Sequence, residues 1–311
     1  MAPPAPAILT EDLGRSFGRV KALDGFDSSV SWGEVTALVG PNGAGKTTLL
    51  LILAGLLAAD RGVALVAEKD PEVDPFAVHA LVGWMPDFFG VYEGLSAREY
   101  LELFGAAYKV PKARLSERAL ELLEMVGLGS FAEAPVHTMS RGQKQRLGFA
   151  RTVVHRPRIL LLDEPASGLD PRARVDLRKL VRAQADDGAA VLVSSHILAE
   201  LEEMSDSVVF VDEGKCRGSY ALKDLPRSTA ARPWRIKSLD ADALARSLLT
   251  ASIPSEVRSD GSATVILADE EAAADLLGRL VRDGVRVVAF EPQGGGLEGA
   301  FLALGEGSGS S

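Results

Sequence analysis

Apolar residues along the chain alternate between short continuous runs and longer stretches with helical spacing. The clearest short runs are VTALV at 35–39, ILLLD at 159–163 and AVLVS at 190–194. Strands that are apolar along their whole length are buried on both faces, as in a parallel sheet covered by helices. The pattern therefore predicts an α/β fold with a parallel sheet.

Two stretches depart from this alternation. Residues 8–30 have shorter apolar runs and a turn signal at Asp24-Gly25, which predicts an antiparallel N-terminal flank. From about residue 88 to residue 158 the spacing is mainly helical, with a capping box at Ser96–Glu99 and a second helix that ends near Gly127. We interpret this stretch as a helical insertion in the α/β core.

The chain changes character near residues 226–233, where two prolines bracket a polar segment that we interpret as a linker. Beyond it, residues 234–304 follow the order strand, helix, strand, strand, helix, strand, with SEVRS at 255–259 as the second strand and a last short helix at 297–304. This order predicts a small α+β domain of ferredoxin-like type. Residues 1–7 and 305–311 have the composition of flexible, disordered tails.

Composition narrows the possible functions. Of the 311 residues 47% are apolar and 25% are charged, with a net charge of -9, which gives no general attraction to nucleic acid or to an anionic membrane. The longest apolar run, LLLILAGLLAA at 49–59, is too short to cross a bilayer and predicts a buried helix. The beginning of the sequence does not resemble a secretion signal, and the single cysteine, Cys216, is compatible with a reducing compartment.

A glycine-rich loop stands between the run at 35–39 and the apolar run at 49–59. Its residues are Gly40, Pro41, Asn42, Gly43, Ala44, Gly45, Lys46, Thr47 and Thr48. This is the P-loop pattern in its strand, loop, helix context, where backbone N–H groups and a helix N-terminus bind phosphate oxygens. Lys46 would reach the β- and γ-phosphates, and the Thr47 hydroxyl would bind Mg²⁺. The core is therefore predicted to be a P-loop NTPase.

Two acids, Asp163 and Glu164, end the apolar run at 159–163. They would lie at the carboxyl edge of the sheet, where open α/β sheets bind ligands. Because successive side chains on a strand point in opposite directions, the two carboxylates can have different functions. Asp163 would hold Mg²⁺ through water, and Glu164 would act as the general base that polarises the attacking water.

Four further motifs accompany the P-loop along the chain: Met139-Ser140-Arg141-Gly142-Gln143, Leu162-Asp163-Glu164-Pro165, Ser167-Gly168-Leu169-Asp170 and Ser195-His196. In this order and spacing they resemble an ABC transporter ATPase subunit over about residues 8–225. The resemblance implies a homodimer of head-to-tail subunits that closes on two ATP molecules and drives an integral membrane permease. The stretch 86–95 most resembles the ABC-2 type export branch.

The resemblance also assigns two nucleotide contacts. Ser140, Gly142 and Gln143 would belong to the signature motif, which grips the γ-phosphate held by the opposite subunit. Arg141 replaces the first glycine that is usual in this motif. The same stretch is a capping-box pattern and would begin a helix. His196 would be the histidine that contacts the γ-phosphate, whereas His79, His137 and His155 are interpreted as structural.

Two other positions have alternative interpretations. The resemblance places Asp170 at the dimer interface; because Pro171 follows it, a helix cap is the alternative. Phe17 stands where the family has an aromatic residue that stacks on adenine, and core packing is the alternative.

Asp87 occupies the position where the family normally has a glutamine that contacts Mg²⁺ and the attacking water. An aspartate suits Mg²⁺, which prefers hard oxygen donors, but its side chain is one methylene shorter, so a closer loop or a bridging water is needed. An ordinary turn residue is the alternative. Phe88 and Phe89, which follow it, would either contact a permease helix or pack inside the helical insertion.

The leading functional hypothesis is an ATPase subunit that uses ATP and Mg²⁺ and is held at the cytoplasmic face of the membrane by its permease. A soluble ABC ATPase that acts on ribosomes or DNA is the alternative. Such proteins usually carry two cassettes or long coiled-coil insertions, and this acidic chain has neither, so we expect no nucleic-acid partner. A P-loop GTPase would need an Asn-Lys-x-Asp or Thr-Lys-x-Asp motif, which the chain lacks.

Overall fold

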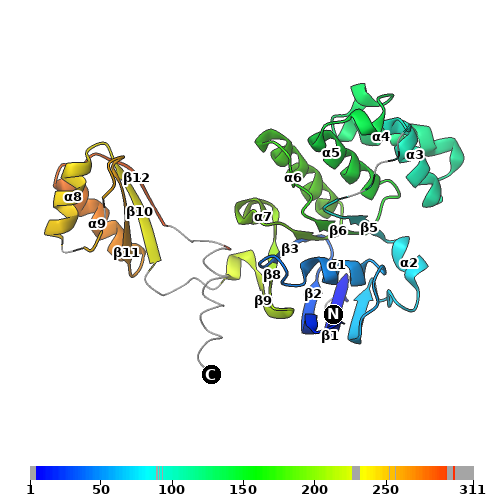
Figure 1. The fold of residues 1–311 in the computed structure, drawn as a ribbon, viewed down its shortest axis with the longest axis horizontal. Helices are drawn as coiled ribbons and strands as arrows, with labels where there is room; N and C mark the ends of the chain where they lie inside the picture. The colour runs from blue at the N-terminus through cyan, green and yellow to red at the C-terminus, as the bar shows by residue number, and fades with distance from the viewer. Residues whose placement is uncertain are drawn as a thin grey trace. The chain divides into compact units, whose positions relative to one another are not determined.

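The chain folds into two compact units, residues 1–224 and 225–311. The computed structural model describes residues 5–88, 90, 92, 94–225, 232–251, 253–255, 257–292 and 297. Figure 1 shows both units with their helices and strands labelled. Each unit has its own hydrophobic core.

A six-stranded sheet forms the centre of the first unit. Its strands, in spatial order, are β5 (Val82–Met85), β6 (Ile159–Asp163), β7 (Ala190–Ser194), β3 (Val35–Val39), β8 (Ser207–Asp212) and β9 (Lys215–Ala221). All neighbours pair in parallel except β8 and β9. Every residue of β3, β6 and β7 is buried, because helices or a second sheet cover both faces. The predicted parallel sheet is therefore confirmed, with an antiparallel strand added at one edge.

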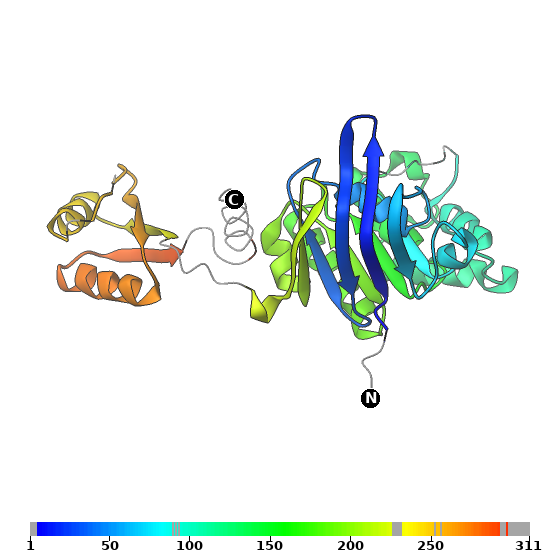
Figure 2. The ribbon, with the colours of Figure 1, turned by 90° about the horizontal axis from the view of Figure 1, so that it is seen from below.

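A second, antiparallel sheet is built from β1 (Ile8–Phe17), β2 (Val20–Val30) and β4 (Arg61–Val66), with β1 in the middle. Figure 2 shows β1 and β2 side by side as the two long blue strands. The predicted antiparallel flank is confirmed, but the turn at Asp24-Gly25 is wrong. These residues lie inside β2 at an irregularity of its register, where Gly25 has φ of +70°. A bulge and a turn use the same residue types, so the sequence pattern does not separate them.

The predicted disordered tail at 1–7 is wrong at its last residue. Ala7 is buried, and its N–H donates to the carbonyl oxygen of Val30 at 2.8 Å, which extends the pairing of β1 with β2. Its own carbonyl accepts from the N–H of Ala67 at 2.8 Å, on the side of β4. Residues 1–4 lie outside the described residues.

Helix α1 (Lys46–Leu53) lies between the two sheets, with contacts to β2 and β4 on one side and to β6 on the other. It is shorter than the apolar run at 49–59. The N–H groups of Gly55 and Leu56 donate to the carbonyls of Ile52 and Leu51, both at 2.9 Å, and Gly55 has φ of +68°. This is a Schellman ending, for which glycine is favoured. On the opposite face of the sheet lie α6 (Pro171–Asp186) and α7 (Leu198–Met204).

The remaining helices of this unit are α2 (Pro75–His79), α3 (Ala97–Ala107), α4 (Leu115–Met125) and α5 (Arg141–Thr152). The last three fall in the stretch that is predicted to be a helical insertion. Both predicted capping boxes are confirmed, with Ser96 and Glu99 at α3 and with Ser140 and Gln143 at α5. None of the helices in the described residues is long and apolar enough to cross a membrane.

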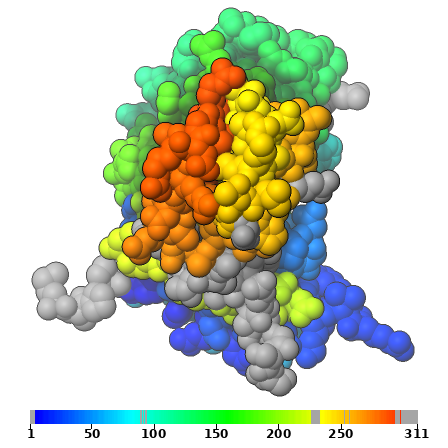
Figure 3. Space-filling model, turned by 90° about the vertical axis from the view of Figure 1, so that its left-hand side faces the viewer, coloured from blue at the N-terminus to red at the C-terminus, as the bar shows by residue number. Residues whose placement is uncertain are grey.

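The second unit consists of β10 (Arg232–Ser238), α8 (Ala241–Thr250), β11 (Ser262–Leu267), α9 (Glu270–Arg282) and β12 (Val287–Pro292). Its antiparallel sheet has the order β11-β10-β12. Apolar side chains of α8 and α9 pack with those of β10 and β11 in one core. Figure 3 views this unit on the face formed by α8, in yellow, and α9, in orange.

Three predictions for this unit need correction or lie outside the described residues. The described residues of SEVRS do not form a strand: Val257 makes an isolated bridge to Ala263 of β11, and Glu256 lies outside the described residues. Pro233 belongs to β10 rather than to a linker, and residues 226–231 are outside the described residues. Of the predicted helix at 297–304 only Leu297 is described, and 305–311 are outside.

His155 follows α5 and is held by two neighbours. Its ring stacks on Tyr108 with centroids 3.8 Å apart, and its Nε2 lies 3.1 Å from the carbonyl oxygen of Val82. Burial lowers the pKa of His155 from 6.5 to about 4, because the charged imidazolium loses its hydration; the hydrogen bond to Val82 opposes this shift, and nearby Arg118 adds to it. The structural interpretation of His155 is confirmed.

This depressed pKa predicts that the first unit loses stability in mild acid. Well above pH 6.5 His155 is neutral in both the folded and the unfolded state; as the pH falls from there toward 4, the unfolded state takes up the proton and the folded state does not. By linkage the free energy of unfolding should fall by about 2 kcal/mol between about pH 7.5 and pH 5. Urea unfolding at the two values measures this loss.

The substitution His155→Phe keeps an aromatic ring against Tyr108 and removes the titrating group, so it should lower the pH dependence by about that amount. The matched control His137→Phe, at an exposed position, should keep it. If the free energy of unfolding depends on pH to the same extent in His155→Phe and in the unaltered chain, the assignment of this pH dependence to His155 is contradicted.

Candidate functional site

The loop from Gly40 to Gly45 joins β3 to α1 and needs glycine at its two ends. A Cβ atom on Gly40 would lie 2.0 Å from the carbonyl oxygen of Val211, and one on Gly45 would lie 2.3 Å from that of Ala22. Gly45 has φ of +106° and is the N-cap of α1. At both positions the absence of a side chain therefore allows the loop backbone to pass close to a neighbouring carbonyl oxygen. The loop ends at the N-terminus of α1.

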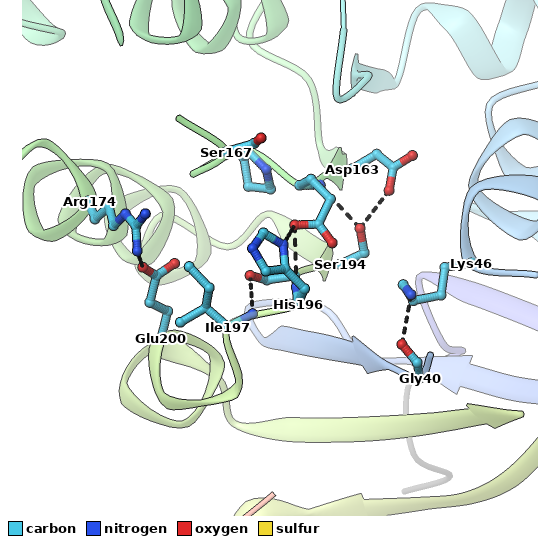
Figure 4. Close-up of polar contacts among 12 residues, drawn as sticks. Gly40, Lys46, Asp163, Ser167, Arg174, Ser194, His196, Ile197 and Glu200 are labelled. Carbon is cyan, nitrogen blue, oxygen red and sulfur yellow. Dashed lines mark hydrogen bonds and ion pairs between the residues drawn. The ribbon is translucent and has the colours of Figure 1, made fainter. Parts of the chain in front are cut away.

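Lys46 is the first residue of α1 and is largely buried. Its ammonium donates to the carbonyl oxygens of Gly40 at 2.7 Å and Pro41 at 3.0 Å, so it spans the loop (Figure 4). Burial lowers the pKa of Lys46, while the nearby carboxylates of Glu164 and Asp163 act in the opposite direction. A cation is thus held beside the loop with part of its hydration removed.

Asp163 ends β6 and is 5% exposed. Its Oδ2 accepts a hydrogen bond from the Thr47 hydroxyl at 2.7 Å, and its Oδ1 accepts one from the Ser194 hydroxyl at 2.6 Å. A buried carboxylate is costly unless donors satisfy it, and here two hydroxyls from neighbouring segments do so. The three side chains therefore form one hydrogen-bonded group at the carboxyl edge of the sheet.

The side chain of Glu164 contacts His196 rather than the two hydroxyls that bind Asp163. Nδ1 of His196 lies 2.6 Å from Oε2 of Glu164, and the backbone N–H of His196 donates to the same oxygen at 3.3 Å. The Glu164 side chain is 17% exposed and that of His196 is 61% exposed. Glu164 has φ of +49°, a left-handed conformation that costs a residue other than glycine about 1 kcal/mol. The divergence of Asp163 and Glu164 that strand geometry predicts is observed.

A hollow of about 290 Å³ lies over the N-terminus of α1. Its lining residues are Val20, Ala22, Asn42, Gly43, Gly45, Lys46, Thr47, Thr48, Asp87, Asp163 and Glu164. The structure thus brings together most of the predicted loop residues, both acids of β6 and Asp87. Asp87 follows β5, which pairs with β6, so the two strands end at the same edge. Phe88 is 86% exposed, so packing inside the helical insertion is wrong for this residue, and Phe89 lies outside the described residues.

Thr47, Asp163 and Asp87 supply the oxygen donors in this hollow that could hold a divalent cation. Hard oxygen ligands of this kind suit Mg²⁺, which usually binds through one or two carboxylates and keeps several waters. Groups of three or more His, Cys, Asp or Glu side chains placed for a metal do not occur within the residues that the structure describes. These donors therefore fit a cation whose other ligands are substrate phosphates and water. They fit less well a cation that is enclosed by protein ligands alone.

The Ser140–Gln143 motif is not among the residues that line the hollow. Ser140 is exposed at the N-terminus of α5, where its side chain accepts from the N–H of Gln143 at 3.2 Å. Arg141 donates to the hydroxyl of Ser167 at 2.8 Å. The motif is therefore anchored to the segment after β6, while its helix N-terminus stays open to solvent.

Phe17 and Asp170 also lie outside the lining of the hollow. Phe17 is 50% exposed, with the Arg15 guanidinium 5.0 Å from its ring centre, so core packing is wrong. It pairs with Val20, which does line the hollow. Asp170 caps α6 by accepting from the N–H of Ala173 at 3.0 Å, and this hydrogen bond lowers its pKa. The cap interpretation is confirmed.

Sequence reasoning missed two residues that support the acids. Ser194 is buried at the end of β7; besides binding Asp163, its hydroxyl accepts from the N–H of Glu164 at 3.1 Å. Gln145, on α5, is 5% exposed and donates to the carbonyls of Glu164 and Pro165. In the sequence, Ser194 and Gln145 are visible only as polar residues on an otherwise apolar strand or helix face. That pattern does not identify the group to which each side chain forms a hydrogen bond.

Comparison with known proteins identifies the family of this chain. Residues 23–167 match the family model described as ABC transporter. The daunorubicin/doxorubicin resistance ATP-binding protein DrrA of Streptomyces peucetius is 33% identical over 306 residues, which cover 97% of this chain and 93% of DrrA. The Nod factor export ATP-binding protein I of Ralstonia nicotianae is 33% identical over 210 residues, 68% of this chain and 65% of that protein.

Among solved structures, the ATP-binding subunit of an ABC transporter superimposes with a TM-score of 0.66 at 29% identity. The match covers 70% of this chain and 91% of that one.

Proposed function

This chain belongs to the ABC transporter family as an ATP-hydrolysing subunit, and we propose that two copies close on ATP and Mg²⁺ to power a separate export permease. The observation that carries the proposal is the 290 Å³ hollow, where a phosphate-binding loop, a buried lysine and three carboxylates meet. The components come from the carboxyl ends of β3, β5 and β6, the edge at which such sheets bind ligands.

ATP would bind with its phosphates over the N-terminus of α1. The N–H groups of the loop from Gly40 to Gly45 and the helix dipole favour negative charge there. Lys46 would exchange its contacts with Gly40 and Pro41 for the β- and γ-phosphates. Asn42, Gly43 and Thr48 line the same hollow. Phe17, exposed beside Val20, is available to stack on the adenine.

Mg²⁺ would be held by Thr47, Asp163 and Asp87. When bound, the ion supplies positive charge that offsets the negative charge developing on the phosphates. The hydrogen bond between Thr47 and Asp163 already places a hydroxyl and a carboxylate together. Asp87 lines the hollow from the loop after β5, and its shorter side chain would be accommodated by a water between it and the ion.

Glu164 would act as the general base toward the attacking water. Its carboxylate lines the hollow and accepts from His196, which lies on the loop that begins α7. His196 would orient the carboxylate and contact the γ-phosphate. Because hydrolysis needs a water held in line with the transferred phosphoryl group, the positions of both side chains determine the rate.

A second copy of the chain would complete each site. The exposed N-terminus of α5, with Ser140, Gly142 and Gln143, is suited to an anion but does not line the hollow of its own chain. In a head-to-tail dimer this motif would meet the γ-phosphate bound by the other copy. Asp170, exposed at the N-terminus of α6, would lie at the same interface.

The permease would dock in an apolar groove of about 440 Å³. Its lining includes Leu56, Phe76, Trp84 and Tyr108, which come from the segment after α1, α2, β5 and the end of α3. Phe76 is 84% exposed. The name of the Nod factor export relative and the sequence resemblance at 86–95 favour an export permease of ABC-2 type. The chain would then be cytoplasmic and held at the inner face of the cell membrane.

The substitution Glu164→Gln should lower turnover strongly and retain ATP binding. Loss of the base should lower kcat by at least about 100-fold, because proton transfer contributes that much, while the loop contacts with ATP remain. Calorimetry, steady-state hydrolysis and gel filtration with ATP measure affinity, rate and a trapped dimer. The control Glu117→Gln, at an exposed position on α4, should behave as the unaltered chain. Turnover near the normal rate in Glu164→Gln would remove Glu164 from this role.

The substitution Asp87→Ala should impair magnesium-dependent hydrolysis more than nucleotide binding. With one oxygen donor lost, a higher Mg²⁺ concentration should be needed for half-maximal turnover, by roughly tenfold for about 1.4 kcal/mol of lost binding. A titration of Mg²⁺ at saturating ATP measures the shift. The control is Asp275→Ala, at an exposed position on α9, which should leave the Mg²⁺ dependence unchanged. Unchanged turnover at low Mg²⁺ would leave Asp87 as a turn residue.

The substitution Phe76→Asp should release the chain from its permease without slowing its own hydrolysis. An exposed side chain changes stability little, but a charge in an apolar docking groove opposes burial. Pull-down from detergent extracts of native cells, followed by mass spectrometry, measures recovery of a multi-span membrane protein. The control is Leu249→Asp, at an exposed position on α8. Recovery with ribosomes, and with no membrane protein, would favour the soluble alternative.

A further inference from the structure

Gln145 is a buried polar residue whose hydrogen bonds go to the segment that contains Glu164. It lies on α5, five positions after Ser140, and is 5% exposed. Its Nε2 donates to the carbonyl oxygen of Pro165 at 2.9 Å and to that of Glu164 at 3.3 Å. A buried amide is costly unless its donors are satisfied. Here the partner is the backbone beside the Glu164 carboxylate.

The backbone at Glu164 needs such support because its conformation is unfavourable for an L-residue. Its φ of +49° is left-handed, and a residue keeps this conformation only where its surroundings hold it. On one side the N–H of Glu164 lies 3.1 Å from the Ser194 hydroxyl and 3.2 Å from the Ser194 carbonyl oxygen. On the other side Gln145 binds the carbonyl of Glu164. The peptide units on both sides of its Cα are therefore held from different elements, β7 and α5.

We propose that Gln145 is a positioning residue for Glu164, which it holds in the left-handed conformation that directs the carboxylate into the hollow. The inference rests on the proposed role of Glu164 as the base. A rotation of this backbone would move the carboxylate away from His196 and from the attacking water, and a displacement of about 1 Å can lower a rate by about 100-fold. ATP binding depends on the loop from Gly40 to Gly45 and should be insensitive to this rotation.

The placement of Gln145 also ties the signature helix to the base of the same chain. Ser140 is the N-cap of α5, Arg141 to Gln143 lie in its first turn, and Gln145 follows on the second turn. The hydrogen bond of Arg141 to Ser167 joins the same two segments, but it lies at an exposed position. Gln145 is the buried connection between them.

The test begins with Gln145→Met, which keeps the length of the side chain and removes the donors. We expect kcat to fall by about 10- to 100-fold, with KM and the calorimetric Kd for ATP within about threefold of the unaltered chain. The matched control is Gln184→Met, at a half-buried position near the end of α6, which should leave kcat unchanged. A role in packing alone would lower stability and the amount of folded protein without this split between kcat and KM.

A double-substitution cycle shows whether Gln145 acts through Glu164. In the Glu164→Gln background the base is already absent, so adding Gln145→Met should change the residual turnover by less than about twofold. An equal fold loss in both backgrounds would overturn the proposal, because the two side chains would then act independently. Normal turnover in Glu164→Gln alone would overturn the proposed base, and the inference with it.

Gln145→Asn provides a milder second variant in case Gln145→Met does not fold. It keeps the amide on a side chain that is one methylene shorter, which weakens both hydrogen bonds. Its kcat should fall by about three- to tenfold, since the contact is partly kept. If Glu164→Gln is inactive while the folded Asn or Met variant turns over within twofold of the unaltered chain, the positioning role of Gln145 is wrong and the base stands.

Discussion

The carboxylate of Asp163 holds together the segments that follow three neighbouring strands of the central sheet. Thr47, after β3, and Ser194, at the end of β7, donate to its two oxygens at 2.7 and 2.6 Å. A charge that is 5% exposed cannot remain without donors, so these side chains must stay where they are. The P-loop and the acids of β6 are thereby placed around one hollow, and Glu164 at its edge contacts His196.

Strand β5 and the loop that follows it contribute residues to both this hollow and the apolar groove. Asp87, in the loop after β5, lines the hollow, and Trp84, on the strand itself, lines the groove. A shift of β5 or of its loop would therefore move lining residues of both the hollow and the groove, because a packed interior transmits displacement. In our proposal the nucleotide and the permease both contact this short strand or the loop after it, which gives hydrolysis and transport a direct physical connection.

A single chain contains most of the residues of the proposed ATP site, but they lie in two separate parts of its surface. The P-loop and the carboxylates share one hollow, while the exposed N-terminus of α5 points to solvent. Gln145 connects α5 to the backbone of Glu164 from within the same chain. In the proposed dimer, the helix that contacts the nucleotide of one copy thus also supports the base that serves the nucleotide of the other.

The sequence by itself determined what local chemistry can specify. The wholly apolar runs at 35–39, 159–163 and 190–194 became the buried strands β3, β6 and β7, because only a covered parallel sheet buries both faces. The capping boxes at Ser96 and Ser140 were readable because their hydrogen bonds join residues three apart.

Tertiary structure decided the features that depend on contacts between distant residues. Asp24-Gly25 became a bulge because β1 pairs on both sides of it, and the described residues of SEVRS make one isolated bridge, at Val257. The roles of Ser194 and Gln145 lie in partners 31 and 20 residues away. A sequence records that such polar residues are present, but only the folded chain determines which group each must satisfy once water has been excluded.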